Sequence, residues 1–408
     1  MLSYIYWTIT IILIIYAVYF AVLGLFAFAK DKTKIKNHKP KTKFAVLIAA
    51  RNEAGVIGGL VESLMNQNYP KELFDVYALA NNCTDNTAEV AKKAGAKILD
   101  IKVPVKSKGD VLKYAFENLV DSDYDAYLIF DADNVVHPDF MSKMNNVYAS
   151  GYRVAQGRKD SKNISDNWLS TSYTLFYYTQ NFFFNRSRMG LNASATINGT
   201  GFMVAKEFVD THGFNPVTIT EDIEVSIMAI LNGVQVVYCD DAITYDEQPT
   251  LFKSSWNQRE RWSKGIMQCC TVYTKKLLSS AFKKHDFASF DKVLFIIAAY
   301  VQLISIALYL FLISFNIVHI IQNVTNLGVF IPDVICLLVG YIFTILLNIF
   351  ILKYYDRNIK ENIPGILLFA IFILSWIPIN FICLFKKDLK WVQIKHDKNV
   401  DVKDLIKK

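Results

Sequence analysis

The sequence predicts an α/β protein in which an open, mostly parallel sheet is flanked by N- and C-terminal transmembrane helices. Hydrophobic residues make up 53% of the 408 residues and charged residues only 20%, against about 45–50% and about 25% in soluble domains. The surplus lies in runs without a charged side chain, and the segment between them alternates short apolar stretches with helical periods. The runs are 1–29, 293–332, 334–352 and 362–385.

The first run, 1–29, is long enough to cross a bilayer core, which takes about 20 residues. Seven lysines and one aspartate follow within residues 30–43, and lysine beside a membrane helix marks the cytoplasmic side. We therefore expect a multi-pass protein of the plasma membrane with a cytosolic domain. A cleaved signal peptide is the alternative, since Ala27-Phe28-Ala29 is a small-x-small site, but no basic residue precedes the long apolar core.

The basic segment 30–43 is expected to meet the anionic headgroups of the bilayer, and nucleic acid is not an expected partner. The net charge of the whole chain is only +7. The six cysteines show no C-x-x-C spacing, so neither a zinc site nor a disulfide framework is indicated.

The cytosolic domain is expected over residues 30–250. Four short, nearly continuous apolar runs are typical of buried parallel strands, and they occupy residues 43–50, 75–80, 97–101 and 126–130. Helical periods lie between them at 56–67, 85–94 and 108–120. In such sheets ligands bind at the carboxyl ends of the strands, which is where the polar motifs of this sequence lie.

The second half of the domain is less regular. We expect an aromatic-rich helical stretch at 165–188, a glycine turn within 197–205 and helices at 221–231 and 251–272. Residues 251–292 are assigned to interfacial helices that lie along the membrane.

The C-terminal region comprises membrane segments over 293–385 and a basic tail over 386–408. If every apolar run spans, the lysines of the tail lie outside, against the positive-inside rule. The 362–385 run contains Pro364 and Pro378, so it either crosses the membrane or re-enters it and packs against its neighbours.

Asp131 and Asp133 follow the fourth predicted strand. Two-residue spacing on extended backbone places both carboxylates on one face, where they can share a cation. Mg²⁺ or Mn²⁺, held by one or two carboxylates together with substrate phosphates, is the usual arrangement in phosphate chemistry.

Thr220-Glu221-Asp222 opens a helix with an inward apolar face. Acidic residues stabilise a helix N-terminus without any other role. The functional interpretation is that Glu221 and Asp222 are catalytic, with Asp222, kept ionised by the helix terminus, as the general base for an acceptor hydroxyl.

Gln258, Arg261 and Trp262 share one face of a predicted helix. The guanidinium suits a diphosphate leaving group and the indole offers a flat face to a sugar ring. An amphipathic helix on the membrane surface is the alternative, and both can hold together.

Two further polar residues have competing explanations. Lys108 begins a predicted helix and can lend charge to a phosphate or be a solvated lysine. Asp85 can contact a nucleotide or cap the helix that follows it.

Five ordered motifs resemble family 2 inverting glycosyltransferases that build polysaccharides in membranes, such as cellulose, hyaluronan, chitin and related β-glucan synthases. The motifs cover about residues 43–270 and are Ala50-Arg51-Asn52-Glu53, Asn81-Asn82-Cys83-Thr84-Asp85, Asp131-Ala132-Asp133, Thr220-Glu221-Asp222 and Gln258-x-x-Arg261-Trp262. The family's acidic residue at the uracil-contacting turn is replaced here by Ala80 and Asn81, and the membrane segments are fewer than in cellulose synthase.

The resemblance implies a GT-A nucleotide-diphospho-sugar transferase fold coupled to a membrane channel. Its implied donor contacts are Asn52, Glu53 and Asp85, with Asp131 and Asp133 binding nucleotide and Mg²⁺ or Mn²⁺. Lys108, which is not part of these motifs, is expected to bind the substrate by adding charge near the leaving diphosphate. Gly199 and Thr200 would lie near the acceptor, Asp222 would be the base, and Gln258, Arg261 and Trp262 would clamp the diphosphate and the chain terminus.

The function expected first is a processive inverting synthase that adds glucose from UDP-glucose to a growing β-glucan and passes it outward, with a second copy or an accessory subunit to complete the channel. An N-acetylglucosamine-containing polymer of the hyaluronan, chitin or poly-GlcNAc type is a rival. Transfer of a single sugar to a lipid carrier is a third possibility, and a non-catalytic membrane component is a fourth.

Overall fold

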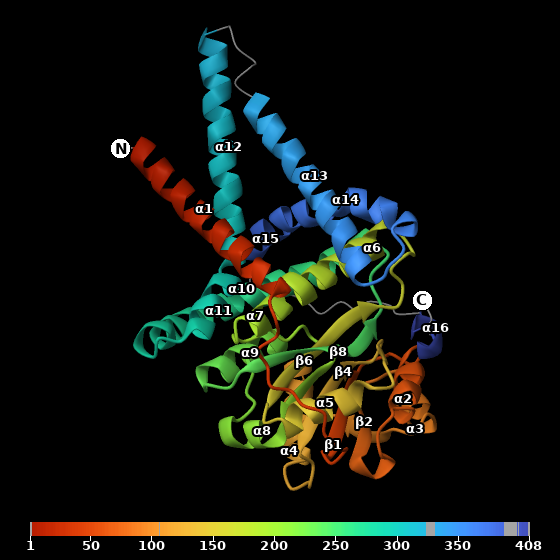
Figure 1. Ribbon diagram of the computed structural model, residues 1–408. Helices are drawn as coiled ribbons and strands as arrows, with labels where there is room; N and C mark the ends of the chain where they lie inside the picture. The colour runs from red at the N-terminus through yellow and green to blue at the C-terminus, as the bar shows by residue number, and fades with distance from the viewer. Residues whose placement is uncertain (1, 106, 324–330, 387–397, 399, 407–408) are drawn as a thin grey trace.

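The computed structural model describes residues 2–105, 107–323, 331–386, 398 and 400–406. Its centre is an eight-stranded sheet with the order β3-β2-β1-β4-β7-β6-β8-β5 (Figure 1). The strands are β1 Phe44–Ala50, β2 Phe74–Asn81, β3 Lys97–Ile101, β4 Ala126–Asp131, β5 Val135–Val136, β6 Val154–Ser161, β7 Phe202–Ala205 and β8 Val236–Asp246.

The predicted α/β class is confirmed. The first four long strands are parallel neighbours, β3 to β2, β2 to β1 and β1 to β4. Beyond them the sheet is mixed, because β7 runs antiparallel between β4 and β6, whereas β6 and β8 are again parallel. β6 and β8 were not predicted, since polar residues such as Arg158 and Asp160 interrupt the apolar pattern of β6.

The two faces of the sheet bury two hydrophobic cores, as the alternation of side chains along a strand requires. Phe44, Val46 and Ile48 of β1 enter one core with α2, α3 and α5, and Ala45 and Leu47 enter the other with α4, α8 and α9. These helices are α2 Ile57–Met65, α3 Thr87–Lys93, α4 Lys108–Asn118, α5 Phe140–Ala149, α8 Lys206–His212 and α9 Glu221–Leu231. Short 3₁₀ turns occupy Phe26–Phe28, Lys71–Leu73 and Lys360–Asn362, and α16 is Val402–Ile406.

A layer of helices separates the sheet from the long apolar helices (Figure 1). It consists of α6 Trp168–Thr179, a π-helical segment Gln180–Arg186, α7 Ser187–Gly190, α10 Phe252–Lys283, α11 Phe287–Ile296, α14 Ile363–Leu374 and α15 Trp376–Phe385. The expected helix at 165–188 therefore contains a π-helical segment, and the helix expected at 251–272 continues to Lys283.

Three described helical segments are long and apolar enough to cross a membrane, Tyr6–Phe28, Val334–Tyr354 and Lys360–Phe385. The first lies in α1 Leu2–Leu25 and its short extension, and the second in α13 Ile331–Tyr354. A fourth span arises if α11 and the first part of α12 Ala298–Asn323 count as one, although they meet at a 50° bend. The expected 293–332 run is therefore divided near residue 297, and its residues 324–330 lie outside the described residues.

The 362–385 run is broken at Ser375 into α14 and α15. The break is bound by Arg259 of α10, whose Nη1 donates to the Phe372 carbonyl at 2.9 Å and to Ser375 Oγ at 2.6 Å. Further along the same pair of helices, Lys264 Nζ donates to the Cys383 carbonyl at 3.2 Å. α15 therefore packs along α10 and α14 packs on α6, and the Arg259 side chain donates to the interrupted backbone.

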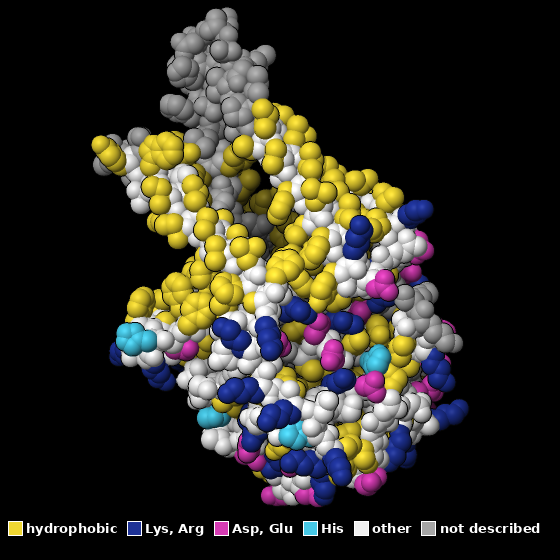
Figure 2. All heavy atoms as spheres, in the orientation of Figure 1, with side chains coloured by type: hydrophobic (Ala, Val, Ile, Leu, Met, Phe, Trp, Pro, Cys, Tyr) yellow, Lys and Arg dark blue, Asp and Glu magenta, His cyan; other side chains and the backbone are white. Residues whose placement is uncertain are grey.

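On the face drawn in Figure 2, apolar and charged side chains gather in different zones. Hydrophobic side chains predominate on the described parts of the long helices, whereas Lys, Arg, Asp and Glu side chains are spread over the sheet domain. The boundary between the two zones passes at the level of α10 and α11 (Figures 1 and 2). Most of the predicted basic tail, 387–397, 399 and 407–408, lies outside the described residues.

Candidate active site

The carboxyl end of β4 carries the Asp131-Ala132-Asp133 motif. Asp131 is the last residue of the strand, and the chain then turns, with the Asn134 N–H donating to the Asp131 carbonyl at 3.2 Å. Asp133 lies in this turn and not on extended backbone. The prediction that extended backbone places both carboxylates on one face is therefore wrong for Asp133. The Asp131 side chain is 37% exposed, whereas Asp133 is buried.

The glycine turn at 198–201 lies against this motif. Thr200 Oγ1 accepts a hydrogen bond of 3.0 Å from the Asp131 N–H and donates one to Asn134. Gly199 and Gly201 have φ of 84° and 64°, a region that favours glycine. At Gly201 a Cβ would also meet Thr244 Oγ1 at 2.5 Å, so this close packing requires glycine.

Lys108 reaches this cluster from the start of α4. Its Nζ donates to Asp131 Oδ1 at 2.5 Å and to the Gly199 carbonyl at 2.7 Å, and lies 3.9 Å from Glu221 Oε1. Burial opposes its charged form, but the carboxylates of Asp131, Glu221 and Asp222 outweigh burial and raise the pKa of Lys108. The solvated-lysine alternative therefore does not describe this structure.

The start of α4 is shaped for this contact. Ser107 and Asp110 form a reciprocal capping box, with Ser107 Oγ accepting from the Asp110 N–H at 3.2 Å. At Gly109 a Cβ would lie 2.6 Å from Pro216 and 3.2 Å from the Glu221 side chain. Glycine beside Lys108 thus allows α4 to approach the start of α9.

Glu221 and Asp222 occupy the first turn of α9. Burial, together with the charge of Asp222, raises the pKa of Glu221 to about 7, against the opposing effect of Lys108. Burial also raises the pKa of Asp222, although the Ile223 N–H bonds to its ionised form. The start of α9 thus favours the ionised form of Asp222, as expected, whereas burial opposes it. A Cβ at Gly199 would lie 3.7 Å from Asp222 Oδ2, so this carboxylate faces the glycine turn.

A buried carboxylate, Glu224, holds the loop before α9. It accepts hydrogen bonds from the N–H groups of Val217, at 3.0 Å, and Thr218, at 2.9 Å, and from the Tyr273 hydroxyl of α10. Carboxylates that accept several hydrogen bonds are firmly oriented. Glu224 thus ties the loop and α10 to the helix that carries Asp222.

α10 brings the Gln258-x-x-Arg261-Trp262 motif to the same region. Gly265 packs so closely on Thr220 that a Cβ there would meet the Thr220 side chain at 2.2 Å. Arg261 lies one turn earlier on the same face of the helix, and it has no hydrogen-bond or ion-pair partner within the described residues. Gln258 Oε1 is likewise buried without a partner in that part of the chain.

Trp262 lies in an aromatic cluster beneath the broken helix. Its ring stacks on Trp376 of α15 at a centroid distance of 6.3 Å and meets Tyr173 and Tyr177 of α6 edge-on, each at 6.1 Å. Part of the aromatic stretch predicted at 165–188 therefore packs around the motif, although Tyr173 and Tyr177 themselves are buried.

Asn52, Glu53 and Asp85 form a separate group at the ends of β1 and β2. Asn52 Oδ1 accepts from the Thr84 N–H at 2.8 Å, and the Glu53 N–H donates to Thr87 Oγ1 at 2.9 Å. Asp85 accepts from the N–H groups of Thr87, at 3.1 Å, and Ala54, at 3.3 Å. These contacts are the capping role weighed for Asp85, and they join the two loops into one rim of the sheet.

Sequence reasoning missed the residues beneath Asp131. Asn134 Nδ2 donates to Asp246 Oδ1 at 2.9 Å, and the buried Lys159 forms a 2.7 Å ion pair with Asp246 Oδ2. Asn134 Oδ1 also accepts from the Asp131 N–H at 3.2 Å. Asp246 ends β8 as Asp131 ends β4, so recognition of β8 as a strand would have revealed it.

The donor set fits a hard divalent cation. The carboxylates of Asp131 and Glu221 lie 2.5 Å and 3.9 Å from the ammonium of Lys108, and the Asp222 carboxylate is near enough to favour the charged form of that lysine. Among the described residues, no three His, Cys, Asp or Glu side chains come close enough to enclose an ion by themselves. This agrees with an ion held by one or two carboxylates and completed by substrate phosphates.

The fold and this cluster define a class of enzyme. Carboxylates and a lysine gather at the carboxyl ends of the strands of a mixed GT-A-type sheet, as expected for a glycosyltransferase that uses a sugar nucleotide. The chain belongs to the glycosyltransferase-like family 2, whose model matches residues 40–265.

Two relatives support the activity. The probable glycosyltransferase YdaM of Bacillus subtilis is 27% identical over 242 residues, which cover 56% of this chain and 56% of YdaM. The β-monoglucosyldiacylglycerol synthase of Synechocystis sp. is 26% identical over 259 residues, which cover 62% of this chain and 54% of that protein. The matched part thus spans little more than half the length of either relative.

A solved structure shares the fold along almost the entire chain. The mannosyltransferase PcManGT from Pyrobaculum calidifontis, determined with GDP-Man and Mn²⁺, superposes with a TM-score of 0.60 at 13% identity. The match covers 95% of this chain and 100% of PcManGT. The protein described here is therefore a family 2 glycosyltransferase with a GT-A fold and candidate membrane-spanning helices.

Proposed function

We propose that the protein is a membrane-anchored, inverting glycosyltransferase that moves one hexose from a UDP-sugar to the hydroxyl group of a lipid acceptor. The observation that carries this proposal is the convergence of Lys108, Asp131, Glu221 and Asp222 next to α10, the helix that packs under the apolar segments. A lipid headgroup at the membrane surface can approach such a site while its tails stay in the bilayer.

The proposed chemistry is a single displacement. The acceptor oxygen attacks the anomeric carbon and loses its proton to Asp222, while the bond from that carbon to the diphosphate breaks. Lys108 and Arg261 stabilise the negative charge that develops on the departing diphosphate. Asp131 and Asp133 would hold Mg²⁺ or Mn²⁺, which supplies further stabilisation of that charge. Asn52, Glu53 and Asp85 form the rim for the nucleotide.

The exposure of the apolar helices favours a lipid acceptor. In the most apolar parts of the two candidate spans in α1 and α13, only 17% and 11% of the residues are buried. In the third candidate span 33% are buried, so most residues of each described span are exposed, which suits contact with lipid. Two relatives are named β-monoglucosyldiacylglycerol synthase. For this reason, UDP-glucose as donor and diacylglycerol as acceptor are the first substrates to test.

A processive polysaccharide synthase is the second candidate. It is favoured by Gln258, Arg261 and Trp262, because a clamp on a retained chain terminus is what repeated addition needs. This function would require a second copy or an accessory subunit to complete the channel. A β-glucan made from UDP-glucose remains the first polymer to test, followed by N-acetylglucosamine-containing polymers.

The proposed organisation has a membrane helix at 1–29, a cytosolic transferase domain at 30–250, interfacial helices at 251–292, membrane or re-entrant segments at 293–385 and a basic cytosolic tail at 386–408. The lysines of 30–43 support this orientation in the plasma membrane. The docking of α15 on α10 supports the re-entrant choice for 362–385, since it would keep the tail on the cytosolic side.

The test is a product analysis of the full-length protein in nanodiscs. UDP-glucose, UDP-N-acetylglucosamine and GDP-mannose are supplied in turn with Mg²⁺ or Mn²⁺, with and without diacylglycerol, and products are resolved by mass spectrometry. We expect a lipid carrying one hexose from UDP-glucose, dependent on diacylglycerol and abolished by EDTA.

Each other outcome has a defined meaning. A ladder of products that resists lipid extraction and yields to a β-glucanase would replace the lipid proposal by the processive one. If the protein binds UDP but releases neither UDP nor GDP from any of the donors, both the lipid proposal and the processive proposal are contradicted.

A further inference from the structure

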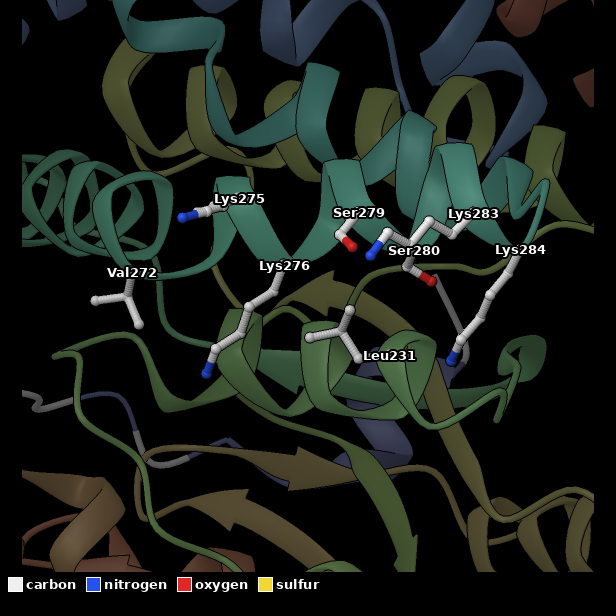
Figure 3. A pocket seen from close by; sticks show the side chains of 8 residues that line it. All are labelled: Leu231, Val272, Lys275, Lys276, Ser279, Ser280, Lys283 and Lys284. Carbon is white, nitrogen blue, oxygen red and sulfur yellow. The ribbon is translucent and has the colours of Figure 1, made fainter.

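We propose that a lysine-lined groove at the end of α10 binds the phosphate headgroup of an anionic phospholipid. The groove has a volume of about 530 Å³ and lies between α10 and the end of α9 (Figure 3). Its lining residues are Leu231, Val272, Lys275, Lys276, Ser279, Ser280, Lys283 and Lys284. It is separate from the transferase cluster, and the proposal rests only on the proposed placement of the protein in the membrane.

The charge of the groove is not balanced by the protein. Four lysines, three in α10 and Lys284 just after it, lie within ten residues, and none has a carboxylate within ion-pair distance in the described part of the chain. The Lys276 and Lys284 side chains extend toward α9, where Leu231 forms the opposite wall (Figure 3). Uncompensated ammonium groups in a concave surface attract a phosphate.

One acidic side chain, that of Asp286, borders the groove without lining it. Asp286 caps α11, accepting from the Ala288 N–H at 3.1 Å and from the hydroxyls of Ser280 and Ser289. It lines a second hollow of about 390 Å³ that shares Ser280 and Lys284 with the groove. The concave surface therefore continues past the lysines toward the start of α11.

The helix that follows the groove, α11, contacts the candidate span of α1. The Tyr16 hydroxyl donates to the Leu294 carbonyl and the Tyr19 hydroxyl to Asp291, each at 2.9 Å. In Figure 2 the boundary between apolar and charged surface passes at this level.

Exposed phenyl rings surround the turn between α10 and α11. Phe282, Phe287 and Phe290 are 70%, 45% and 37% exposed. Aromatic rings next to lysines are typical of a surface that inserts shallowly into a bilayer while its ammonium groups meet anionic headgroups. This pairing favours a lipid over a water-soluble phosphate as the occupant.

The test compares lipids that differ only in headgroup charge. Full-length protein in a neutral detergent is titrated with phosphatidylglycerol or phosphatidylcholine of identical acyl chains, and bound lipid is counted by native mass spectrometry. We expect phosphatidylglycerol to bind at least tenfold more tightly than phosphatidylcholine, because each lysine near an anionic headgroup adds attraction.

The groove variant changes Lys275, Lys276, Lys283 and Lys284 to glutamine. It should weaken phosphatidylglycerol binding at least tenfold, and the corresponding four Lys→Arg changes should retain binding. The matched control changes four exposed lysines of the sheet domain to glutamine and should bind as the unmodified protein does; these are Lys71, Lys92, Lys93 and Lys102. Circular dichroism and thermal melting confirm that each variant is folded.

Three outcomes overturn the proposal. The first is that the groove variant binds phosphatidylglycerol as tightly as the unmodified protein does. The second is that the unmodified protein binds the two lipids equally. The third is that glycerol phosphate or inorganic phosphate at matched concentration displaces phosphatidylglycerol, which would identify a site for free phosphate. Because sugar transfer is not the readout, failure here is distinguishable from failure of the proposed function. UDP release by the groove variant should stay within twofold in neutral detergent.

Discussion

At the scale of single residues, Asp222 is the group whose removal best tests the chemistry. Asp222→Asn keeps the size of the side chain but cannot accept the acceptor's proton. We expect the rate of sugar transfer to fall at least hundredfold, the range found for general bases, while the dissociation constant for UDP changes less than threefold.

The control for this variant is Asp210→Asn, at an exposed carboxylate on α8 that pairs with Lys206, four residues earlier. It should leave both quantities unchanged. Retained transfer by Asp222→Asn would exclude Asp222 as the base.

Glu221 predicts a pH-dependent stability. Its ordinary pKa of 4.5 is raised to about 7 in the folded protein, so between these values the folded state keeps a proton that the unfolded chain has lost. This bound proton adds up to about 3 kcal/mol to the free energy of unfolding. The contribution is fully present below pH 4.5 and is lost as the pH rises through 7.

Glu221→Gln removes this dependence, because the amide does not titrate. Between pH 5 and pH 8, measured in EDTA, the unmodified protein should lose the contribution of Glu221 to its melting temperature and the variant should not. The melting temperature of the variant minus that of the unmodified protein should therefore increase with pH. Glu117→Gln, on the exposed surface of α4, is the control and should give a constant difference. A constant difference for Glu221→Gln as well would contradict the raised pKa.

At the scale of elements, Arg259 holds the break between α14 and α15. It is fully buried and donates to Phe372 and Ser375 at the break, and burial lowers the pKa of its guanidinium. Arg259→Ala removes the charged donor from both acceptors, and the Phe372 carbonyl keeps only its 2.6 Å hydrogen bond from Ser375 Oγ. A hydrogen bond from a charged group contributes about 1.5–3 kcal/mol. We expect α15 to detach locally from α10.

The measurement is the thiol reactivity of Cys383, which is only 1% exposed and donates to the Glu260 carbonyl. Its labelling by a small maleimide, quantified by peptide mass spectrometry, should be at least tenfold faster in Arg259→Ala. Lys253→Ala, at an exposed position in the first turn of the same helix, is the control. Equal labelling in both would mean that Arg259 does not hold the segment.

At the scale of the whole molecule, the proposed orientation places the sheet domain and the far end of α12 on opposite sides of the membrane. Asn323→Cys, at the end of α12, should react with a membrane-impermeant maleimide in intact cells, above the background of the natural cysteines. Lys92→Cys, exposed on α3, should react only after permeabilisation. The opposite pattern would place the transferase domain outside the cell.

Much of this architecture could be predicted because it depends on local pattern. The runs at 43–50 and 126–130 are buried on both faces and so read as continuous apolar strands. The charge-free run at 1–29 reads as a membrane helix for a similar reason. β6 was not recognised, because Arg158, Lys159 and Asp160 lie in it and their partners are contributed by distant segments.

The candidate site shows the same division. The positions of Asp131, Glu221 and Asp222, after a strand or at a helix start, indicated transferase chemistry only together with the other ordered motifs of the sequence. The contact of Lys108 with both Asp131 and Glu221 depends on the approach of α4 to α9 at Gly109, and the ion pair of Lys159 with Asp246 depends on the pairing of β6 with β8.

Local periodicity and side-chain chemistry were thus sufficient to predict the α/β class, the apolar helices and the family motifs, since each depends on residues close together in the chain. Burial raised the pKa values of Glu221 and Asp222, and Arg259 came to bind a break more than 100 residues away. These properties exist only in the folded molecule, because desolvation and long-range hydrogen bonds depend on which distant segments the fold brings into contact.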